Sequence, residues 1–204
     1  MTDLTCRLYL IAPSPLPENF DTILDEALEG GDVAALRLDA AEDDAASLAA
    51  IRRVAHAHGV AVLLANRPDL AAAASCDGAH LDDGRPAAGL RRVLGDLQLG
   101  IYCGGSRDQA MQAGEDGADY VAFGPYFAAD EPADLELLRW WVELMELPAV
   151  AEGAITLENC PALIEAGADF LAVGDAVWTH EAGPAAAIAA FNEAILASAP
   201  RVAD

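Results

Sequence analysis

The segment VAVLLANRPDLAAAASCDGAHL, residues Val60–Leu81, decides the fold. Its apolar run Val60–Ala65 predicts a strand that ends at the polar group Asn66-Arg67-Pro68-Asp69. An alanine-rich stretch then predicts a short helix, and Gly78–Leu81 predicts the next strand. In parallel α/β folds, ligands bind where the carboxyl ends of strands meet the loops that follow. The segment therefore indicates both the architecture and the place of a functional site.

The same alternation of strand and helix runs along the whole chain. Apolar runs that are short and apolar throughout, as in strands buried on both faces, recur with helix-like stretches between them. They predict strands at Arg7–Ala12, Val33–Leu38, Val60–Ala65, Gly78–Leu81, Leu97–Tyr102, Tyr120–Gly124, Ala149–Ala151 and Phe170–Gly174.

A weak internal repeat supports a closed arrangement. Gly117–Gly124 reads GADYVAFG and Gly167–Gly174 reads GADFLAVG, while Gly30–Arg37 is a looser copy. In each copy a glycine can end a helix, an acid begins the turn, and an apolar strand follows. Eight such units predict an α/β fold of the (β/α)₈ TIM-barrel type, with an open doubly wound sheet as the alternative. Residues 1–204 are expected to form one domain, with its core at about 7–198.

Charge excludes several functions. The formal net charge is −23, and all 11 cationic side chains are arginines. Without lysine, neither a Schiff base on a protein amine nor a Walker-type phosphate loop is available. So acidic a chain is not expected to bind nucleic acid, because a phosphate backbone requires a basic face.

Other features bound the cellular setting. No apolar run approaches the length of a membrane span, and no secretory signal is recognised at the start. We expect a soluble, cytoplasmic protein with a small-molecule ligand and no membrane partner. The 4 cysteines lack the spacing of a zinc site, so buried free thiols are expected. Trp140 and Trp141 point different ways on a helix, so one of them is a candidate contact in a homodimer.

Several phrases together resemble those of one enzyme family. LYLI (Leu8–Ile11), the strand that carries Arg37, ANRPDLA, DGAHL, DYVAFGPYF, LPAVAEGAI and GADFLAVGDAV occur in the order found in thiamine phosphate synthases and their thiazole tautomerase relatives. The resemblance extends from Arg7 to about Ala190. It implies a (β/α)₈ barrel that joins a hydroxymethylpyrimidine pyrophosphate to a thiazole phosphate, with Mg²⁺ and release of pyrophosphate.

The chain also departs from that family's pattern. Asn66 stands where the family has a metal-binding carboxylate, and Arg85 stands at a second metal-binding aspartate position. Tyr102-Cys103-Gly104 replaces a Ser-x-His pattern, and the loop AADEP after Phe127 lacks the family's threonine and lysine. Pro125 stands where the tautomerases carry a histidine, so that activity lacks its acid–base group.

Candidate site residues follow from the strand ends and from the resemblance. Arg37 and Arg67 are the candidate catalytic residues, because arginine binds anions bidentately. The alternative is that each pairs with a nearby acid, such as Asp39 or Asp69. Asp82 and Asp83 are candidate ligands for Mg²⁺, or else belong to a solvated turn. The candidate substrate-binding residues are Asn66, His80, Tyr102, Cys103, Gly124, Glu152, Gly153, Ala154, Gly174 and Asp175.

For three of these candidate residues, the sequence also offers a reason against ligand contact. A histidine on an apolar strand, such as His80, is more often part of the core than a ligand contact. Glu152 and Asp175 add negative charge to loops that would hold a phosphate. Two functions therefore remain open: a thiamine phosphate synthase, or an inactive or repurposed barrel that binds a small phosphorylated or heterocyclic ligand.

Overall fold

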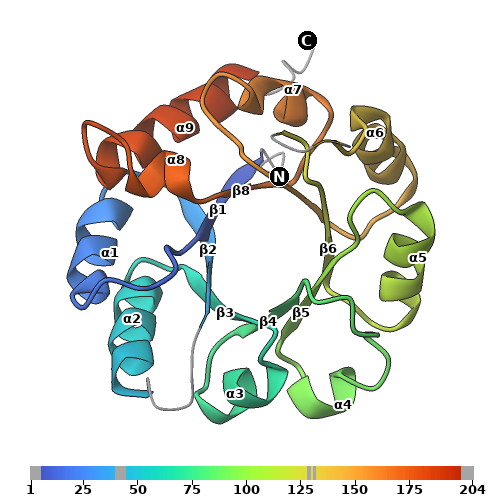
Figure 1. The fold of residues 1–204 in the computed structure, drawn as a ribbon, viewed down its shortest axis with the longest axis horizontal. Helices are drawn as coiled ribbons and strands as arrows, with labels where there is room; N and C mark the ends of the chain where they lie inside the picture. The colour runs from blue at the N-terminus through green and yellow to red at the C-terminus, as the bar shows by residue number, and fades with distance from the viewer. Residues whose placement is uncertain (1–5, 40–44, 128–129, 131, 199–204) are drawn as a thin grey trace.

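The computed structural model describes residues 6–39, 45–127, 130 and 132–198. Within these ranges, eight parallel strands follow one another in chain order and close into a barrel (Figure 1). The predicted TIM barrel is confirmed, and the open sheet is excluded because β1 also pairs with β8. The strands are β1 (Arg7–Ile11), β2 (Val33–Leu38), β3 (Ala61–Ala65), β4 (Gly78–Leu81), β5 (Gln98–Tyr102), β6 (Tyr120–Phe123), β7 (Ala149–Glu152) and β8 (Phe170–Val173).

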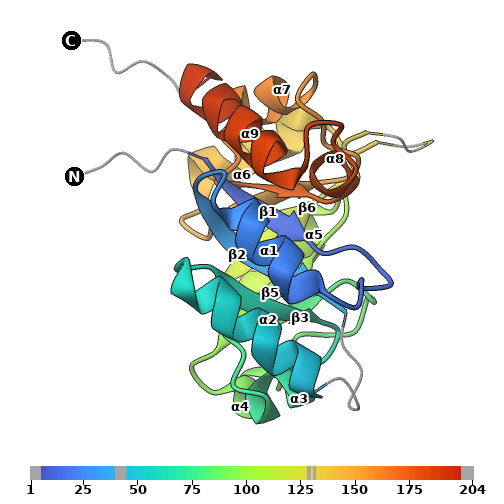
Figure 2. The ribbon, with the colours of Figure 1, turned by 90° about the vertical axis from the view of Figure 1, so that its left-hand side faces the viewer.

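The helices form a ring outside the barrel, as seen down its axis and from the side (Figures 1 and 2). A helix lies between every two consecutive strands, as the alternating sequence pattern predicts, and two further helices follow the last strand. The helices are α1 (Phe20–Leu28), α2 (Ala45–Ala57), α3 (Pro68–Ala73), α4 (Arg91–Leu94), α5 (Arg107–Glu115), α6 (Leu135–Leu144), α7 (Cys160–Glu165), α8 (Asp175–Trp178) and α9 (Pro184–Ser198).

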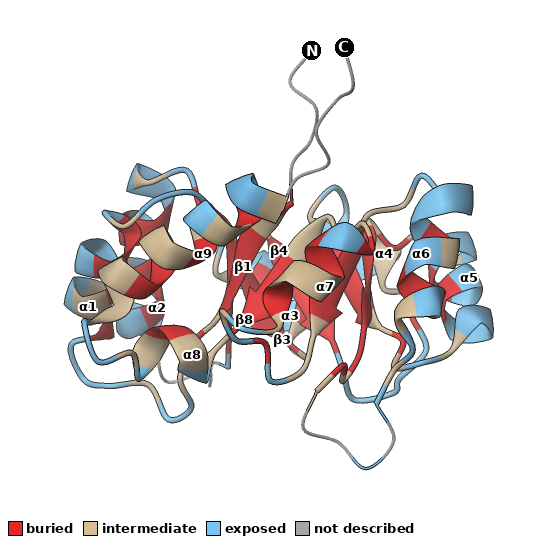
Figure 3. Cartoon of the chain, turned by 90° about the horizontal axis from the view of Figure 1, so that it is seen from above, coloured by how far each residue is buried: buried red, intermediate tan, exposed pale blue. Residues whose placement is uncertain are grey.

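Two layers of side chains pack on the two faces of the strands. Figure 3 shows the strands buried and the outward faces of many helices exposed. The larger layer fills the space between barrel and helices, with residues such as Leu36, Leu64 and Phe123. The smaller layer lies inside the barrel and includes Tyr9 and Tyr120. Side chains alternate between the two faces of a strand. The residues that point into the barrel are therefore the ones whose side chains can face a site at the carboxyl end of the strand.

Four aspartates tie neighbouring strands together at the amino end of the barrel. Asp77, Asp119 and Asp169 directly precede β4, β6 and β8, and each carboxylate accepts a hydrogen bond from a backbone N–H at the start of the preceding strand. The acceptor–donor distances are 2.7 Å to Val62 N, 2.7 Å to Leu99 N and 2.8 Å to Ala149 N.

The fourth aspartate completes the pattern in a different way. Asp32 precedes β2 and pairs with the Arg7 side chain of β1 at 2.7 Å. Asp119 and Asp169 are the acids of the two repeated GAD phrases. The repeat therefore encodes a hydrogen bond between an even-numbered strand and the odd-numbered strand before it.

The two adjacent tryptophans of α6 have different surroundings. Trp141 is 2% exposed, packs against Phe123, and donates a hydrogen bond to the Leu147 carbonyl at 2.8 Å. Trp140 is only partly buried, and the Arg107 guanidinium lies 4.4 Å from its ring centroid. This confirms that the two rings point different ways. A homodimer contact through Trp140 stays a prediction.

In the part of the chain that the structure describes, no helix is both long enough and apolar enough to cross a bilayer.

The strand-tying aspartates predict a specific loss of stability. Replacing Asp169 by alanine leaves the Ala149 N–H without its acceptor, and we expect the free energy of unfolding to fall by about 1–2 kcal/mol. Urea denaturation measures the change. Asp96→Ala is the matched control, because Asp96 is an exposed acid at the same end of the barrel. An equal effect of both substitutions would contradict the role given to Asp169.

Candidate functional site

Each end of the barrel carries a cavity. The one at the amino end has a volume of about 560 Å³ and is lined largely by apolar residues at the strand starts, such as Ala61, Leu97 and Phe170. The one at the carboxyl end has about 830 Å³ and lies between the loop after β1 and the ends of β2 and β3. Asn66, Arg67 and Asp39 line the second cavity, which therefore joins the polar groups predicted from sequence.

A buried ion pair crosses the barrel interior near its carboxyl end. Arg37 on β2 donates from Nη1 to Glu152 Oε2 on β7 at 3.0 Å, and their side chains are only 9% and 14% exposed. Burial raises the pKa of Glu152, and Arg37 opposes this shift. For Arg37, burial acts against the charged form, but Glu152 and nearby groups leave its pKa raised overall.

Beneath this pair lies a chain of hydrogen bonds among buried side chains. The Tyr120 hydroxyl is 2.9 Å from His80 Nδ1 and 3.1 Å from the Tyr9 hydroxyl. Burial and the positive charge of Arg37 hold the pKa of His80 well below its usual value, so the imidazole is neutral. Nε2 of His80 is buried and has no hydrogen-bond partner among the described residues. His80 is therefore a core residue, as the commoner role of such a histidine suggests.

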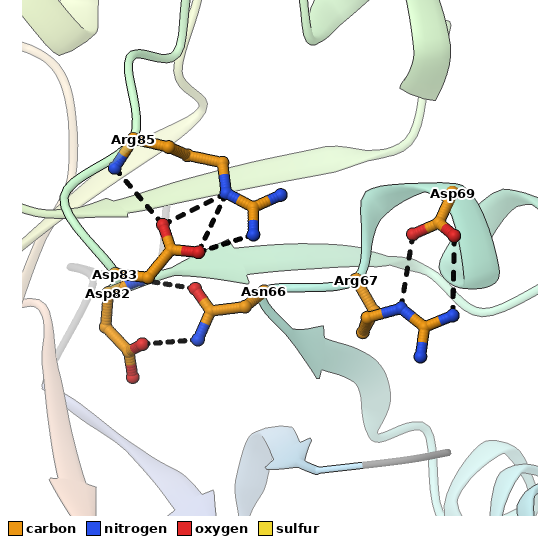
Figure 4. Close-up of polar contacts among 6 residues, drawn as sticks. All are labelled: Asn66, Arg67, Asp69, Asp82, Asp83 and Arg85. Carbon is orange, nitrogen blue, oxygen red and sulfur yellow. Dashed lines mark hydrogen bonds and ion pairs between the residues drawn. The ribbon is translucent and has the colours of Figure 1, made fainter. Parts of the chain in front are cut away.

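The loops after β3 and β4 are linked by Asn66 and Asp82 (Figure 4). Asn66 Nδ2 donates to Asp82 Oδ1 at 2.5 Å, and Asp82 N donates to Asn66 Oδ1 at 3.0 Å. Asn66 has a φ of 56°, in the left-handed region that asparagine tolerates better than most residues. Two reciprocal bonds thus hold a strained strand end beside an exposed carboxylate.

The two neighbouring arginines each face an acid two residues away in the chain (Figure 4). Arg67 binds both oxygens of Asp69 at 3.3 Å. Arg85 binds Asp83 with its Nε at 2.8 and 3.0 Å, and also through Nη2. The pKa of Asp69 and that of Asp83 are lowered, chiefly by these side-chain hydrogen bonds.

The Arg67–Asp69 and Arg37–Glu152 pairs differ in how much free energy their separation costs. Exposed pairs of the Arg67–Asp69 kind contribute roughly 0–1 kcal/mol, and Asp69 is 64% exposed. Breaking a buried pair such as Arg37–Glu152 leaves an uncompensated charge and costs about 3–5 kcal/mol. A bound anion can therefore displace Asp69 from Arg67 far more easily than Glu152 from Arg37.

The carboxylates provide limited support for a divalent cation. Within the described ranges, no three histidine, cysteine or acidic side chains gather as a metal site. Asp82 uses one oxygen for Asn66, whereas Arg85 engages both oxygens of Asp83. Mg²⁺ commonly binds through one or two carboxylates together with substrate phosphates and water. The residues thus fit a Mg²⁺ that arrives with a phosphorylated substrate, and Asp82 would hold it.

Two glycines let the loops after β6 and β7 approach each other. A Cβ on Gly153, where φ is +108°, would lie 2.5 Å from Pro125 Cα, and one on Gly124 would lie 2.3 Å from the Glu152 carbonyl oxygen. Ala154 also has a positive φ, of 48°. Gly174 precedes the four-residue helix α8, in which Asp175 is exposed. These predicted phosphate-loop positions follow the carboxyl ends of their strands, where ligands of such barrels bind. Their contact with phosphate stays a prediction.

The remaining candidates differ in how accessible they are. Tyr102 is partly exposed at the end of β5, where burial raises its pKa, and the charges of Glu152 and Asp82 raise it further. Cys103 is 1% exposed, and burial raises its pKa to about 12. The assignment of Cys103 to substrate binding stays a prediction, and the burial of its thiol argues against it. Of the loop AADEP, residues 128, 129 and 131 lie outside the described part of the chain.

Sequence reasoning missed the two inward tyrosines and the partner of Arg37. Tyr9 and Tyr120 occupy inward positions of β1 and β6, a signal that strand alternation contains once the barrel register is known. Glu152 lies 115 residues from Arg37, and no spacing rule connects them.

Comparisons with known proteins agree on one family. Residues 8–177 match the model of the family described as thiamine monophosphate synthase. The thiamine-phosphate synthase of Rhodospirillum centenum is 50% identical over 94% of this chain and 98% of its own. That of Hyphomonas neptunium is 45% identical over 91% and 92%. A solved structure of thiamine phosphate pyrophosphorylase from Pyrococcus furiosus superposes with a TM-score of 0.83 at 27% identity, covering 94% of this chain and 96% of that one.

The depressed pKa of His80 predicts a pH dependence of stability. The unfolded chain takes up a proton on this histidine below about pH 6.5, whereas the folded chain does not, so acidification favours unfolding. His80→Asn removes this proton uptake. Below pH 6.5, the free energy of unfolding should therefore fall less steeply in the variant, by at most about 1.4 kcal/mol per pH unit. Urea titrations at pH 7 and 5.5 measure both slopes, and identical slopes would contradict the prediction.

Proposed function

The chain belongs to the thiamine monophosphate synthase family, and we propose that it joins a hydroxymethylpyrimidine pyrophosphate to a thiazole phosphate, releasing pyrophosphate. The observation that carries this proposal is the 50% identity to a thiamine-phosphate synthase over nearly the full length of both chains. The cavity at the carboxyl end of the barrel, with Asn66 and Arg67 in its wall, supports the same conclusion.

The reaction forms one bond and breaks another at the same carbon. The thiazole nitrogen bonds to the exocyclic methylene carbon of the pyrimidine, and the bond from that carbon to the pyrophosphate oxygen breaks with its electron pair. The leaving group gains negative charge as the bond breaks, so groups that stabilise this charge lower the barrier. Arg67 suits this role because it lies at the wall of the carboxyl-end cavity and a guanidinium binds phosphate oxygens bidentately.

Mg²⁺ would supply charge neutralisation for the departing pyrophosphate. Asp82 would hold the ion, and Asn66 positions the Asp82 carboxylate through its two hydrogen bonds. Both carboxylate oxygens of Asp83 already accept hydrogen bonds from Arg85. In this arrangement Asn66 acts as a positioning residue, where other family members have a metal-binding carboxylate.

The rival function is a repurposed barrel that binds a ligand without catalysing synthesis. Its support is that Arg37, Arg67 and Arg85 all have carboxylate partners among the described residues. Incubating the purified protein with both substrates and Mg²⁺ separates the two functions. We expect thiamine phosphate to form in proportion to the amount of enzyme, as measured by chromatography. Product no higher than in a protein-free control would reject the synthase.

The role of Asp82 has its own test. Asp82→Asn removes the carboxylate assigned to Mg²⁺, and we expect half-maximal activity to need at least about tenfold more Mg²⁺. Asp83→Asn is the matched control, since Asp83 is paired with Arg85, and its Mg²⁺ requirement should change much less. Initial rates across a Mg²⁺ titration measure both variants. A larger effect from Asp83→Asn would contradict the assignment.

A further inference from the structure

The cavity at the amino end of the barrel has no part in the proposed function. Its volume is about 560 Å³, and small-molecule sites have volumes of roughly 300–1,000 Å³. Ala35 on β2 and Ala61 on β3 are register partners in its wall, and both belong to the layer inside the barrel. Bulky branched residues usually fill the interior of an eight-stranded barrel, so two alanines side by side leave space there.

Tyr9, Tyr120 and Phe170 line this cavity with aromatic rings. The ring centroids of Tyr9 and Tyr120 lie 6.1 Å apart, at an interplanar angle of 63°. Their hydroxyls are 3.1 Å from each other, and that of Tyr120 is also 2.9 Å from His80 Nδ1. Because the hydroxyls are already hydrogen-bonded, the rings are the surface that remains for a ligand. Such a surface suits an apolar or aromatic group.

The charged groups around the cavity favour a cation. The charged residues that line it are Arg7, Asp77, Asp96 and Asp119. Arg7 donates two hydrogen bonds to Asp32, each at 2.7 Å, so its charge is already balanced. Asp77 and Asp119 accept hydrogen bonds from backbone and side-chain donors.

Asp96 differs from these residues. It is exposed, and its carboxylate has no hydrogen-bond or ion-pair partner among the described residues. Since Asp96 also lines the cavity, it places a negative charge at the opening. An ammonium group would give this carboxylate a partner, whereas a ligand carboxylate or phosphate would be repelled by it.

We propose that the amino-end cavity binds a small organic ammonium ion with an aromatic body. The body packs against the rings of Tyr9, Tyr120 and Phe170, and the ammonium group lies at the opening beside Asp96. This site goes beyond the proposed function, because the cavity assigned to the substrates lies at the other end of the barrel.

Three probes of similar size test the charge preference. At neutral pH benzylamine is a cation, benzyl alcohol is uncharged and benzoate is an anion, and NMR titration of the wild-type protein gives the affinity for each. We expect benzylamine to bind about threefold more tightly than benzyl alcohol, since an exposed ion pair is weak, and at least about tenfold more tightly than benzoate. Equal affinities, a preference for either other probe, or no binding of benzylamine would overturn the proposal.

Two alanine methyl groups on β3 report where the probe binds. Ala61 lines the cavity at the amino end, and Ala65 lines the cavity at the carboxyl end. We expect benzylamine to shift the NMR signal of the Ala61 methyl group and to leave that of Ala65 unchanged. A shift at Ala65 alone would overturn the proposal. So would an Ala61 signal that changes with protein concentration before any probe is added, because a second copy of the chain would then cover the cavity.

The variant Asp96→Asn tests the carboxylate at the opening. We expect the ratio of the affinities for benzylamine and benzyl alcohol to fall about threefold, to near one. Asp108→Asn is the matched control, because Asp108 is an exposed acid in the first turn of α5, and its ratio should equal that of wild type. An unchanged ratio in Asp96→Asn would overturn the proposal.

The variant Ala61→Leu tests the cavity itself. The leucine side chain occupies part of the space, so we expect the affinities for benzylamine and benzyl alcohol to fall together, by at least about tenfold. Circular dichroism establishes that the variant is folded, and a folded variant with unchanged affinities overturns the proposal. The probe ratios of the wild-type protein and of Asp96→Asn decide the charge preference whether or not this variant folds.

Discussion

The site depends on one ion pair that crosses the barrel interior. Arg37 and Glu152 come from β2 and β7, strands that do not pair with each other, and their 3.0 Å contact spans the space between. Neither charge is tolerable in that position without the other. The pair thereby sets the charge at the barrel mouth: the Arg37 guanidinium is neutralised by Glu152, and the proposed role of binding the anionic part of the substrate falls to Arg67.

The interior below the pair has a different character. Tyr9, Tyr120 and His80 share hydrogen bonds around a single hydroxyl, and all three are nearly inaccessible to solvent. Burial raises the pKa of both tyrosines and lowers that of the histidine, so each group is held neutral. An uncharged polar layer thus separates the charged mouth from the cavity at the amino end of the barrel. The two ends of the molecule are chemically distinct for this reason.

The fold was predictable from sequence to within one or two residues per strand, because buried parallel strands are apolar throughout and helices separate them. The repeated GAD phrase predicted turns correctly, although the hydrogen bonds made by Asp119 and Asp169 were not foreseen. The contacts of Asn66 with Asp82 join adjacent strand ends and follow from barrel geometry. The Arg37–Glu152 contact could not be predicted, because it depends on which side chains are long enough to meet across the interior.

The hydrogen bonds of the aspartates at the amino end also group the eight strands into four neighbouring pairs. Each ties an even-numbered strand to the strand before it, through Asp32, Asp77, Asp119 and Asp169. A break in the chain between β4 and β5 leaves every one of these ties within a single fragment, whereas a break between β3 and β4 puts Asp77 and Val62 on separate fragments. The natural unit of this barrel is thus a pair of strands with their helices. Complementing fragments and circular permutants whose new ends lie between these pairs would keep all of these contacts.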